Sequence, residues 1–189
     1  MRAFIALETP ERVKKELDNI QKELKTKGIQ ARLVRPEIAH LTLSFLGEIP
    51  QNKIARVEKI LEKAVQENSP VKLRLNKVGC FPSLLKARII FLSLEGELGK
   101  LNALVLKICK NLKKENIWFD KKLFVPHLTL GRLKNQQNLE GIIKKIKVCK
   151  IEFLGEKISL IQSTLTPQGP IYKTLSSFSL KGKTTPFIT

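Results

Sequence analysis

The chain has 189 residues, enough for one large domain or two closely joined lobes around an apolar core. Its 35 Lys and Arg residues outnumber 17 Asp and Glu, and the net charge of +18 favours a polyanionic partner such as nucleic acid over a merely lysine-rich solvated surface. Three cysteines are too few for a disulfide scaffold, and no apolar run has the length of a signal peptide or a membrane span, so we expect a soluble cytoplasmic protein.

Hydrophobic periodicity divides the first half of the chain into alternating strands and helices. The first helix has the clearest signals, because Thr9 can cap it, Pro10 suits its first turn and Gly28 can end it. The elements predicted for this half are a strand over 2–7, a helix over 10–27, an extended piece over 31–34, a strand over 40–46, a helix over 54–65 and a strand over 71–78.

The second half repeats this order and then adds further strands. Its predicted elements are a strand over 87–94, a helix over 97–112, a strand from 127, a polar turn over 135–138, a short helix over 139–146, strands over 150–153 and 156–165, a turn over 166–170 and a strand over 171–180. Strands and helices in this order predict the α+β class. The tail over 181–189 has no periodic pattern, and we expect it to be loose.

One tetrapeptide, His-Leu-Thr-Leu, occurs at 40–43 and again at 127–130, and it contains both histidines of the chain. Polar and apolar residues alternate within it, as they do in a strand with one buried face. Each copy should therefore pack its leucines into a core and present an imidazole beside a hydroxyl on the opposite face.

The two motifs lie 87 residues apart, and the same offset aligns 4–8 with 91–95 and 71–75 with 158–162. We interpret this as an internal duplication within one domain that spans 1–189, with repeats over about 1–86 and 87–180. A pseudo-two-fold axis between the repeats could place the two His-Thr faces on opposite sides of one central cleft.

Two facing histidines could bind a metal, fill the core or exchange protons. Two ligands are too few for a metal site, and the motif repeats no further ligand, while a structural role does not account for two identically placed rings. Since imidazole titrates near ~6.5, one ring can be a neutral base while the other is a charged acid. Displacement at phosphorus uses both, with threonine hydroxyls donating to the phosphate oxygens. The sequence has no glycine-rich phosphate loop, and we expect no cofactor.

Paired His-x-Thr-x strands in a duplicated chain resemble the two-histidine (2H) phosphoesterase superfamily. Four segments are similar to those of its LigT-like RNA 2′,3′-cyclic phosphodiesterases, formerly called 2′-5′ RNA ligases. They are Arg-Ala-Phe-Ile-Ala-Leu at 2–7, the flanked first motif at 35–48, the flanked second motif at 124–132, and Ser-Thr-Leu-Thr-Pro-Gln-Gly-Pro-Ile-Tyr at 163–172.

The resemblance implies a bilobal α+β fold, in which each lobe is an antiparallel sheet with helices on its outer face. It implies that water opens an RNA 2′,3′-cyclic phosphate to a 2′-phosphate without a metal. By the same resemblance, His127 would accept the proton of the water and His40 would protonate the leaving oxygen. Thr42, Thr129 and Arg132 would bind the phosphate.

Arg132 does not fit an unbroken strand, in which it would point with Leu128 and Leu130 away from the cleft. Gly131 could permit a bulge that turns its side chain back. Phe81 could stack on a terminal base, but we expect a packed aromatic there and leave it out of the site.

Two alternatives remain open at this point. The reverse reaction, 2′-5′ RNA ligation, would use the same histidines, and a non-catalytic RNA-binding protein would use the same basic cleft. The sequence also does not distinguish the acid from the base, or identify the RNA, tRNA fragments included. We expect a monomer, since the duplication supplies both halves of a site, and we expect the basic surroundings to lower the pKa of both histidines.

Overall fold

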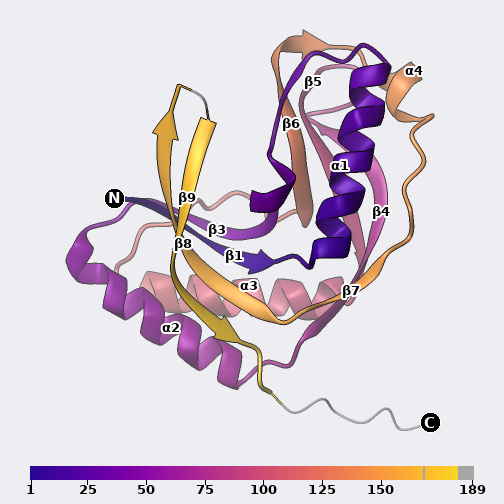
Figure 1. Ribbon diagram of the computed structural model, residues 1–189. Helices are drawn as coiled ribbons and strands as arrows, with labels where there is room; N and C mark the ends of the chain where they lie inside the picture. Colours follow the sequence, from indigo (N-terminus) through magenta and orange to yellow (C-terminus); the bar gives the residue numbers. More distant parts are fainter. Residues whose placement is uncertain (168, 183–189) are drawn as a thin grey trace, which may run out of the picture.

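One curved antiparallel sheet runs through the computed structural model, which describes residues 1–167 and 169–182 (Figure 1). Its strands lie in the order β7-β4-β5-β6-β3-β1-β8-β9, and β2 pairs with β6 off this path. The strands are β1 (Arg2–Glu8), β2 (Ala31–Leu33), β3 (His40–Glu48), β4 (Val71–Phe81), β5 (Ala87–Gly96), β6 (His127–Gln137), β7 (Glu152–Gly155), β8 (Lys157–Thr166) and β9 (Gly169–Ser179).

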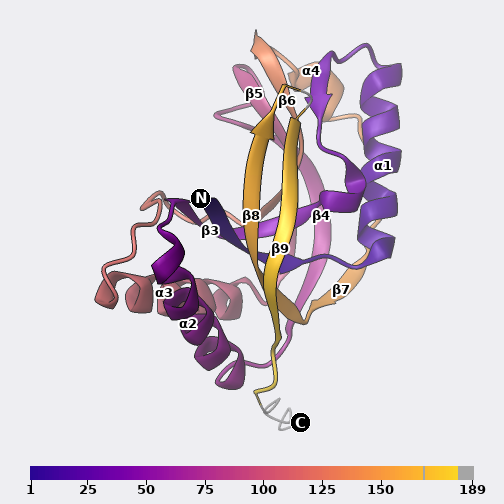
Figure 2. The ribbon, with the colours of Figure 1, turned by 60° about the vertical axis from the view of Figure 1, so that its left-hand side comes forward.

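The helices form two groups on the sheet. They are α1 (Glu11–Thr26), α2 (Ile54–Gln66), α3 (Leu98–Lys114) and α4 (Glu140–Ile143). Figures 1 and 2 show α1 and α4 beside β4, β5 and β6, whereas α2 and α3 lie beneath β1, β3 and β8. Among the described residues, no helix combines the length and the apolar character that crossing a membrane requires.

The two parts of the sheet meet where β3 and β6 pair, at Leu41 and Leu128. We call β3, β1, β8 and β9 with α2 and α3 the first lobe, and β6, β5, β4, β7 and β2 with α1 and α4 the second lobe. Both lobes are antiparallel sheets with helices on one face, so the predicted fold class is confirmed. Each lobe nevertheless combines strands from both halves of the sequence, because β8 pairs with β1 and β4 pairs with β5.

The predicted offset of 87 holds between the motifs but not between their neighbours. Ala6 pairs with Thr42 and Phe91 pairs with Thr129, so corresponding residues of β1 and β5 are 85 apart. The alignment of 4–8 with 91–95 is therefore wrong by two residues. The alignment of 71–75 with 158–162 is also wrong, since Leu7 pairs with Ile158 while its counterpart Leu92 pairs with Val78. The duplication itself stays a prediction.

Other boundaries differ because tertiary pairing overrides local pattern. The polar stretch predicted as a turn belongs largely to β6, where Gln137 still pairs with Ala87. The predicted helix over 139–146 is only the short α4. The predicted loose tail lies outside the described residues from position 183 onward, and so does position 168 of the turn predicted over 166–170.

The core lies mainly between the sheet and the helices. Alternate residues of β1 divide between its two faces: Ala3, Ile5 and Leu7 belong to the main core, while Phe4 and Ala6 pack with Ile161 on the other face. The second face is the one that carries the histidines. Burial of the leucines of both motifs therefore fixes the direction in which the imidazoles point.

A buried amide fixes α1 to the second lobe. Gln21 is 4% exposed, and its Nε2 donates to the carbonyl oxygens of Val34 at 2.6 Å and Leu130 at 2.9 Å. Thr129 and Gly131 of β6 pair with neighbouring residues of β5, and Leu130 between them has no partner there. The contact from Gln21 therefore holds a bulge in place.

We expect Gln21→Ala to lower the free energy of unfolding by about 2 kcal/mol, because it removes two buried hydrogen bonds and leaves a small void. Urea unfolding followed by circular dichroism measures this change. Gln66→Ala on the exposed end of α2 is the matched control and should change stability by less than about 0.5 kcal/mol. Equal stabilities of the two variants would contradict this role for Gln21.

Candidate active site

The two His-Leu-Thr-Leu motifs lie side by side where the lobes meet. Leu41 and Leu128 pair across β3 and β6 and are buried against the helices. His40, Thr42 and the corresponding His127 and Thr129 are half-buried on the opposite face. The predicted division of each motif into a core face and a polar face is therefore confirmed.

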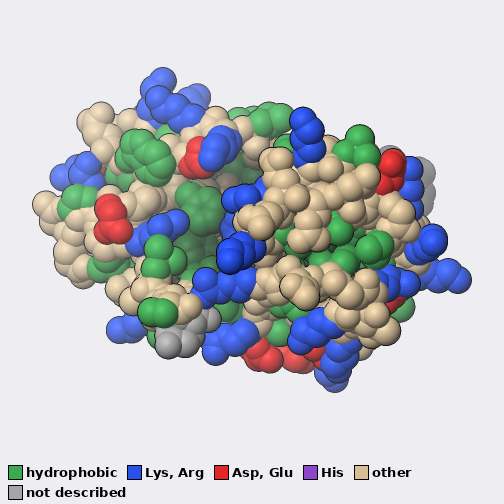
Figure 3. All heavy atoms as spheres, turned by 90° about the horizontal axis from the view of Figure 1, so that it is seen from above, with side chains coloured by type: hydrophobic (Ala, Val, Ile, Leu, Met, Phe, Trp, Pro, Cys, Tyr) green, Lys and Arg blue, Asp and Glu red, His purple; other side chains and the backbone are tan. Residues whose placement is uncertain are grey.

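A cavity of about 790 Å³ opens beside the motifs. Four of the five predicted site residues line it, namely His40, Thr42, Thr129 and Arg132, whereas His127 lies outside its lining. The remaining walls come from β1, β2, the segment before β3 and the β8–β9 hairpin. Seen from above, Lys and Arg side chains gather around a hollow between the two parts of the molecule (Figure 3).

Three further arginines line the cavity, Arg2, Arg32 and Arg35. Arg32 on β2 also donates to the carbonyl oxygen of Pro167 at 3.0 Å, and so connects the second lobe with the β8–β9 hairpin of the first. A cavity with four arginine side chains is suited to an anionic ligand.

Both imidazoles are held in the same way. His40 Nδ1 lies 2.8 Å from the carbonyl oxygen of Ile38, and His127 Nδ1 lies 2.7 Å from that of Val125. A carbonyl oxygen only accepts, so each Nδ1 carries a hydrogen and each Nε2 is left to exchange protons. His40 Nε2 lies 3.1 Å from Thr42 Oγ1, whose hydroxyl can donate to it.

Aromatic rings fix the planes of both histidines. His40 stacks on Phe4 with ring centroids 4.7 Å apart, and Tyr172 meets it edge-on at 5.4 Å. His127 meets Phe81 edge-on at 5.1 Å, and Phe81 stacks on Phe91 at 4.2 Å. Phe81 is thus a packed aromatic, as expected, although it also supports a site residue. Sequence reasoning did not include Phe4 or Tyr172 among the site residues.

A bulge turns Arg132 into the cavity. Ile90 pairs with Gly131 and Phe91 with Thr129, which leaves Leu130 as the extra residue and reverses the alternation after it. The conflict between the position of Arg132 and strand parity is resolved in this way. Phe45 occupies the corresponding place on β3, because Leu43 is the extra residue there, and it also lines the cavity. The offset of 87 from Arg132 could have identified Phe45.

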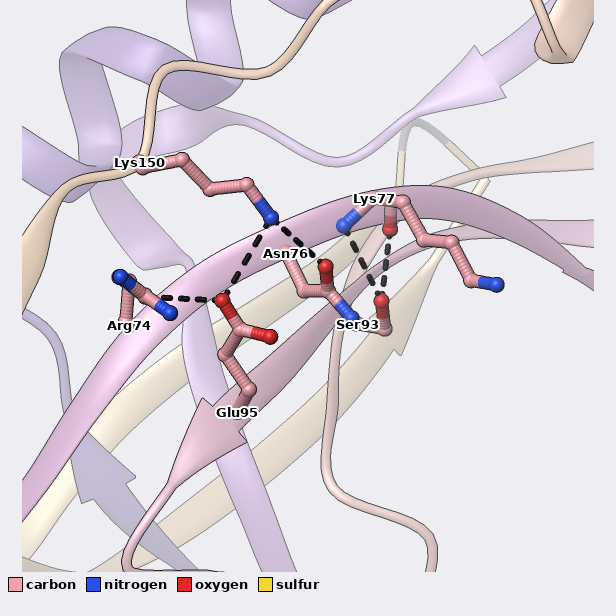
Figure 4. A network of polar contacts seen from close by, with 6 residues as sticks. All are labelled: Arg74, Asn76, Lys77, Ser93, Glu95 and Lys150. Atoms are coloured by element: carbon pink, nitrogen blue, oxygen red, sulfur yellow. Dashed lines mark hydrogen bonds and ion pairs between the residues drawn. The ribbon is translucent and has the colours of Figure 1, made fainter.

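A further irregularity lies in β4, which β5 separates from the strand of His127. Figure 4 shows the polar network around it, formed by Arg74, Asn76, Lys77, Ser93, Glu95 and Lys150. Ser93 Oγ accepts from the Lys77 amide at 3.2 Å and donates to the Lys77 carbonyl at 2.9 Å, so it pairs with a residue that the β4–β5 ladder leaves unpaired. The irregularity lies between the start of β4 and Phe81, the residue of β4 that contacts His127.

Burial is the main influence on the two histidines. It lowers the pKa of His40 more than the Ile38 carbonyl raises it, and the nearby His127 lowers it further. Burial also lowers the pKa of His127 most, against the Val125 carbonyl, and the Arg132 charge adds to the lowering. The predicted direction is confirmed, but the predicted cause, basic surroundings, is secondary to loss of hydration.

Metal ligands are sparse in the described part of the chain. Over residues 1–167 and 169–182, no three His, Cys, Asp or Glu side chains come together in an arrangement that could hold a metal ion. The predicted residues that line the cavity carry an imidazole, two hydroxyls and a guanidinium group.

Comparison with known sequences identifies the family. A sequence profile described as LigT-like phosphoesterase matches residues 7–91 and 94–172. The chain belongs to the LigT-like phosphoesterase family. It is 36% identical to a Methanocaldococcus jannaschii protein named RNA 2′,3′-cyclic phosphodiesterase, over 94% of this chain and 100% of that protein. An Aquifex aeolicus protein of the same name is 33% identical over 96% of this chain and 98% of that protein.

Solved structures agree with this membership. A crystal structure of a Thermus thermophilus protein superposes with a TM-score of 0.81 at 28% identity, covering 97% of this chain and all of that one. E. coli LigT complexed with 3′-AMP gives a TM-score of 0.72 at 18% identity, covering 95% of this chain and 97% of that one. The LigT-like fold expected from the motifs is confirmed.

The charge of Arg132 gives a testable pKa relation in this phosphoesterase. We expect both histidines to titrate below 6.5, and Arg132→Gln to raise the pKa of His127 because a nearby cation disfavours the imidazolium. Chemical shifts of the imidazole protons followed by NMR across the pH range measure both values. Arg12→Gln, on the exposed face of α1, should leave them unchanged. A pKa of His127 above 6.5 in the unsubstituted protein would overturn this account.

Proposed function

We propose that this LigT-like protein hydrolyses the 2′,3′-cyclic phosphate at an RNA end to a 2′-phosphomonoester, with its two histidines as acid and base. One observation carries the proposal: two imidazoles from antiparallel strands each have Nδ1 bound to a backbone carbonyl, which leaves both Nε2 atoms for proton exchange, and a cavity rich in arginine opens beside the motifs that carry them. The relatives named RNA 2′,3′-cyclic phosphodiesterase support the choice of substrate.

The proposed reaction transfers one proton at each histidine. Neutral His127 accepts a proton from water at Nε2 while the water oxygen attacks phosphorus. Protonated His40 donates from Nε2 to the 3′ oxygen as its bond to phosphorus breaks, which leaves the phosphate on the 2′ oxygen. The charge of Arg132 beside His127 supports this assignment, since it favours the neutral ring that a base requires.

The remaining groups would stabilise the negative charge that develops on the phosphate. Thr42 and Thr129 both line the cavity and carry hydroxyl donors on the histidine face. Arg132 would add a charge-assisted hydrogen bond to a non-bridging oxygen. Every step thus has a donor or an acceptor in the chain itself, so we propose that the reaction needs no metal.

We also propose that the protein acts as a monomer. Both motifs and Arg132 belong to one sheet of one chain, and His40, Thr42, Thr129 and Arg132 line one cavity beside His127. A second copy would therefore add no group to the site.

The decisive test is hydrolysis of a short RNA with a 2′,3′-cyclic phosphate end in EDTA. We expect a 2′-phosphate product by phosphorus NMR, and a fall in kcat of about a thousandfold in His40→Ala and in His127→Ala, because each removes one proton transfer. His127→Asn tests the same proton transfer with less disturbance of the structure, since the asparagine amide can still donate to the Val125 carbonyl. An intact cyclic end with bound RNA would favour a binding protein, and joined 2′-5′ products would favour a ligase.

The lowered pKa values also determine the pH dependence. Catalysis needs one neutral and one protonated imidazole, and the product of these two fractions is largest between the two pKa values. Since both values lie below 6.5 in the free protein, we expect a bell-shaped profile of kcat/KM with its maximum on the acid side of that value. A maximum above pH 7, or a flat profile, would count against the histidine pair.

A further inference from the structure

Two exposed aromatic side chains lie at the end of β3, one in the lining of the cavity and one beyond it. Phe45 lines the cavity and is 42% exposed, and its carbonyl oxygen accepts from the Asp120 amide at 2.9 Å. This hydrogen bond ties the segment before β6 to β3. In that segment Trp118 is 63% exposed, and its ring lies over Gly47, where an added Cβ would be 3.0 Å from Cζ3. We call Phe45 and Trp118 the aromatic platform.

The indole ring of Trp118 is held by a backbone contact although most of the side chain is exposed to solvent. One side of the ring rests on the backbone of Gly47, which has a φ of +60° and no side chain to displace it. Most of the remaining ring surface is open to solvent. An aromatic ring that is fixed by backbone contact and open on its other side can receive a planar partner without rearrangement.

Positive charge surrounds the aromatic platform. Arg2 lines the cavity, as does Phe4, and Lys121 is exposed in the same segment as Trp118. The nearby carboxylates are already engaged, since Asp120 pairs with Lys122 at 3.4 Å and Glu48 pairs with the N-terminal amine at 3.4 Å. Exposed aromatic rings can stack on the bases of single-stranded nucleic acid, and the surrounding cations can bind its phosphates.

We propose that the aromatic platform binds the nucleotides that precede the cyclic phosphate, so that the preferred substrate is an RNA strand of several nucleotides and not a nucleoside cyclic phosphate. The inference rests on the proposed function for its reactive end. The bases stack on Phe45 and Trp118, and Arg2 and Lys121 contact the phosphates between them.

The length of the platform sets the length of RNA that it can recognise. Thr42 and Gly47 pair with Ala6 and Ala3 of β1, which are three residues apart, so the distance between them along the sheet is about 10 Å. At about 3.4 Å per stacked nucleotide, this distance corresponds to about three nucleotides, and to fewer in an extended strand. The gain from longer substrates should therefore level off at about three nucleotides.

The kinetic test compares substrates of one to eight nucleotides, all ending in a 2′,3′-cyclic phosphate. We expect kcat/KM to rise with length up to about three nucleotides. Trp118→Ala should lower kcat/KM about tenfold for the longer substrates, because one base loses its stacking partner, and should leave the mononucleotide unchanged. Trp118→Phe should keep most of the gain. Leu106→Ala is the control, since Leu106 is 70% exposed on α3 and lies outside the platform.

A binding test does not depend on turnover. Trp118 is the only tryptophan of the chain, so its fluorescence reports directly on stacking. RNA with a 2′-phosphate end should quench this fluorescence at five nucleotides far more strongly than a single nucleotide does at equal saturation of the site.

Three outcomes would overturn the inference. They are a kcat/KM independent of length, an equal loss in Trp118→Ala for short and long substrates, and fluorescence that does not respond to bound RNA. The second outcome would assign Trp118 a structural role through the segment that leads to Val125 and His127. If cyclic ends of every length stay intact, the proposed function fails, and the fluorescence titration still decides whether the platform binds RNA.

Discussion

The pairing of Leu41 with Leu128 is the constraint on which the site depends. It is a short junction between the two lobes of the one sheet, yet it determines which face of each motif is buried. Because side chains alternate along a strand, a slip of one residue would move both leucines to the cleft and both imidazoles into the core. The free energy of burying two leucines therefore also maintains the orientation of the two histidines.

Each histidine is supported by both halves of the sequence. His40 contacts Phe4 from β1 and Tyr172 from β9, while His127 contacts Phe91 from β5 and Phe81 from β4. In each case one ring comes from the same half of the chain as the histidine and the other comes from the opposite half. The bulge that directs Arg132 is also supported from the other half of the chain. Gln21 of α1, more than a hundred residues earlier in the sequence, donates to the carbonyl oxygen of Leu130.

Local pattern predicted most of the strands and helices, the burial of the motif leucines and the proximity of His40 to His127. The prediction from local pattern failed for features that depend on how a strand pairs with its neighbour. The bulges at Leu43 and Leu130 cannot be read from alternation, since an unpaired residue is defined only by the neighbouring strand. For the same reason the register between β1 and β5 was misjudged, and the importance of burial for the histidine pKa values was not foreseen.

The exchange of strands between the halves has a consequence for the integrity of the chain. The boundary between the two halves falls in the short connection from β4 to β5, two strands that pair with each other inside the second lobe. A cut there would leave two fragments, each with strands in both lobes, and the fragments would pair through β1–β8 and β4–β5. Neither fragment could complete a lobe alone, so the two would have to fold together as a complemented pair.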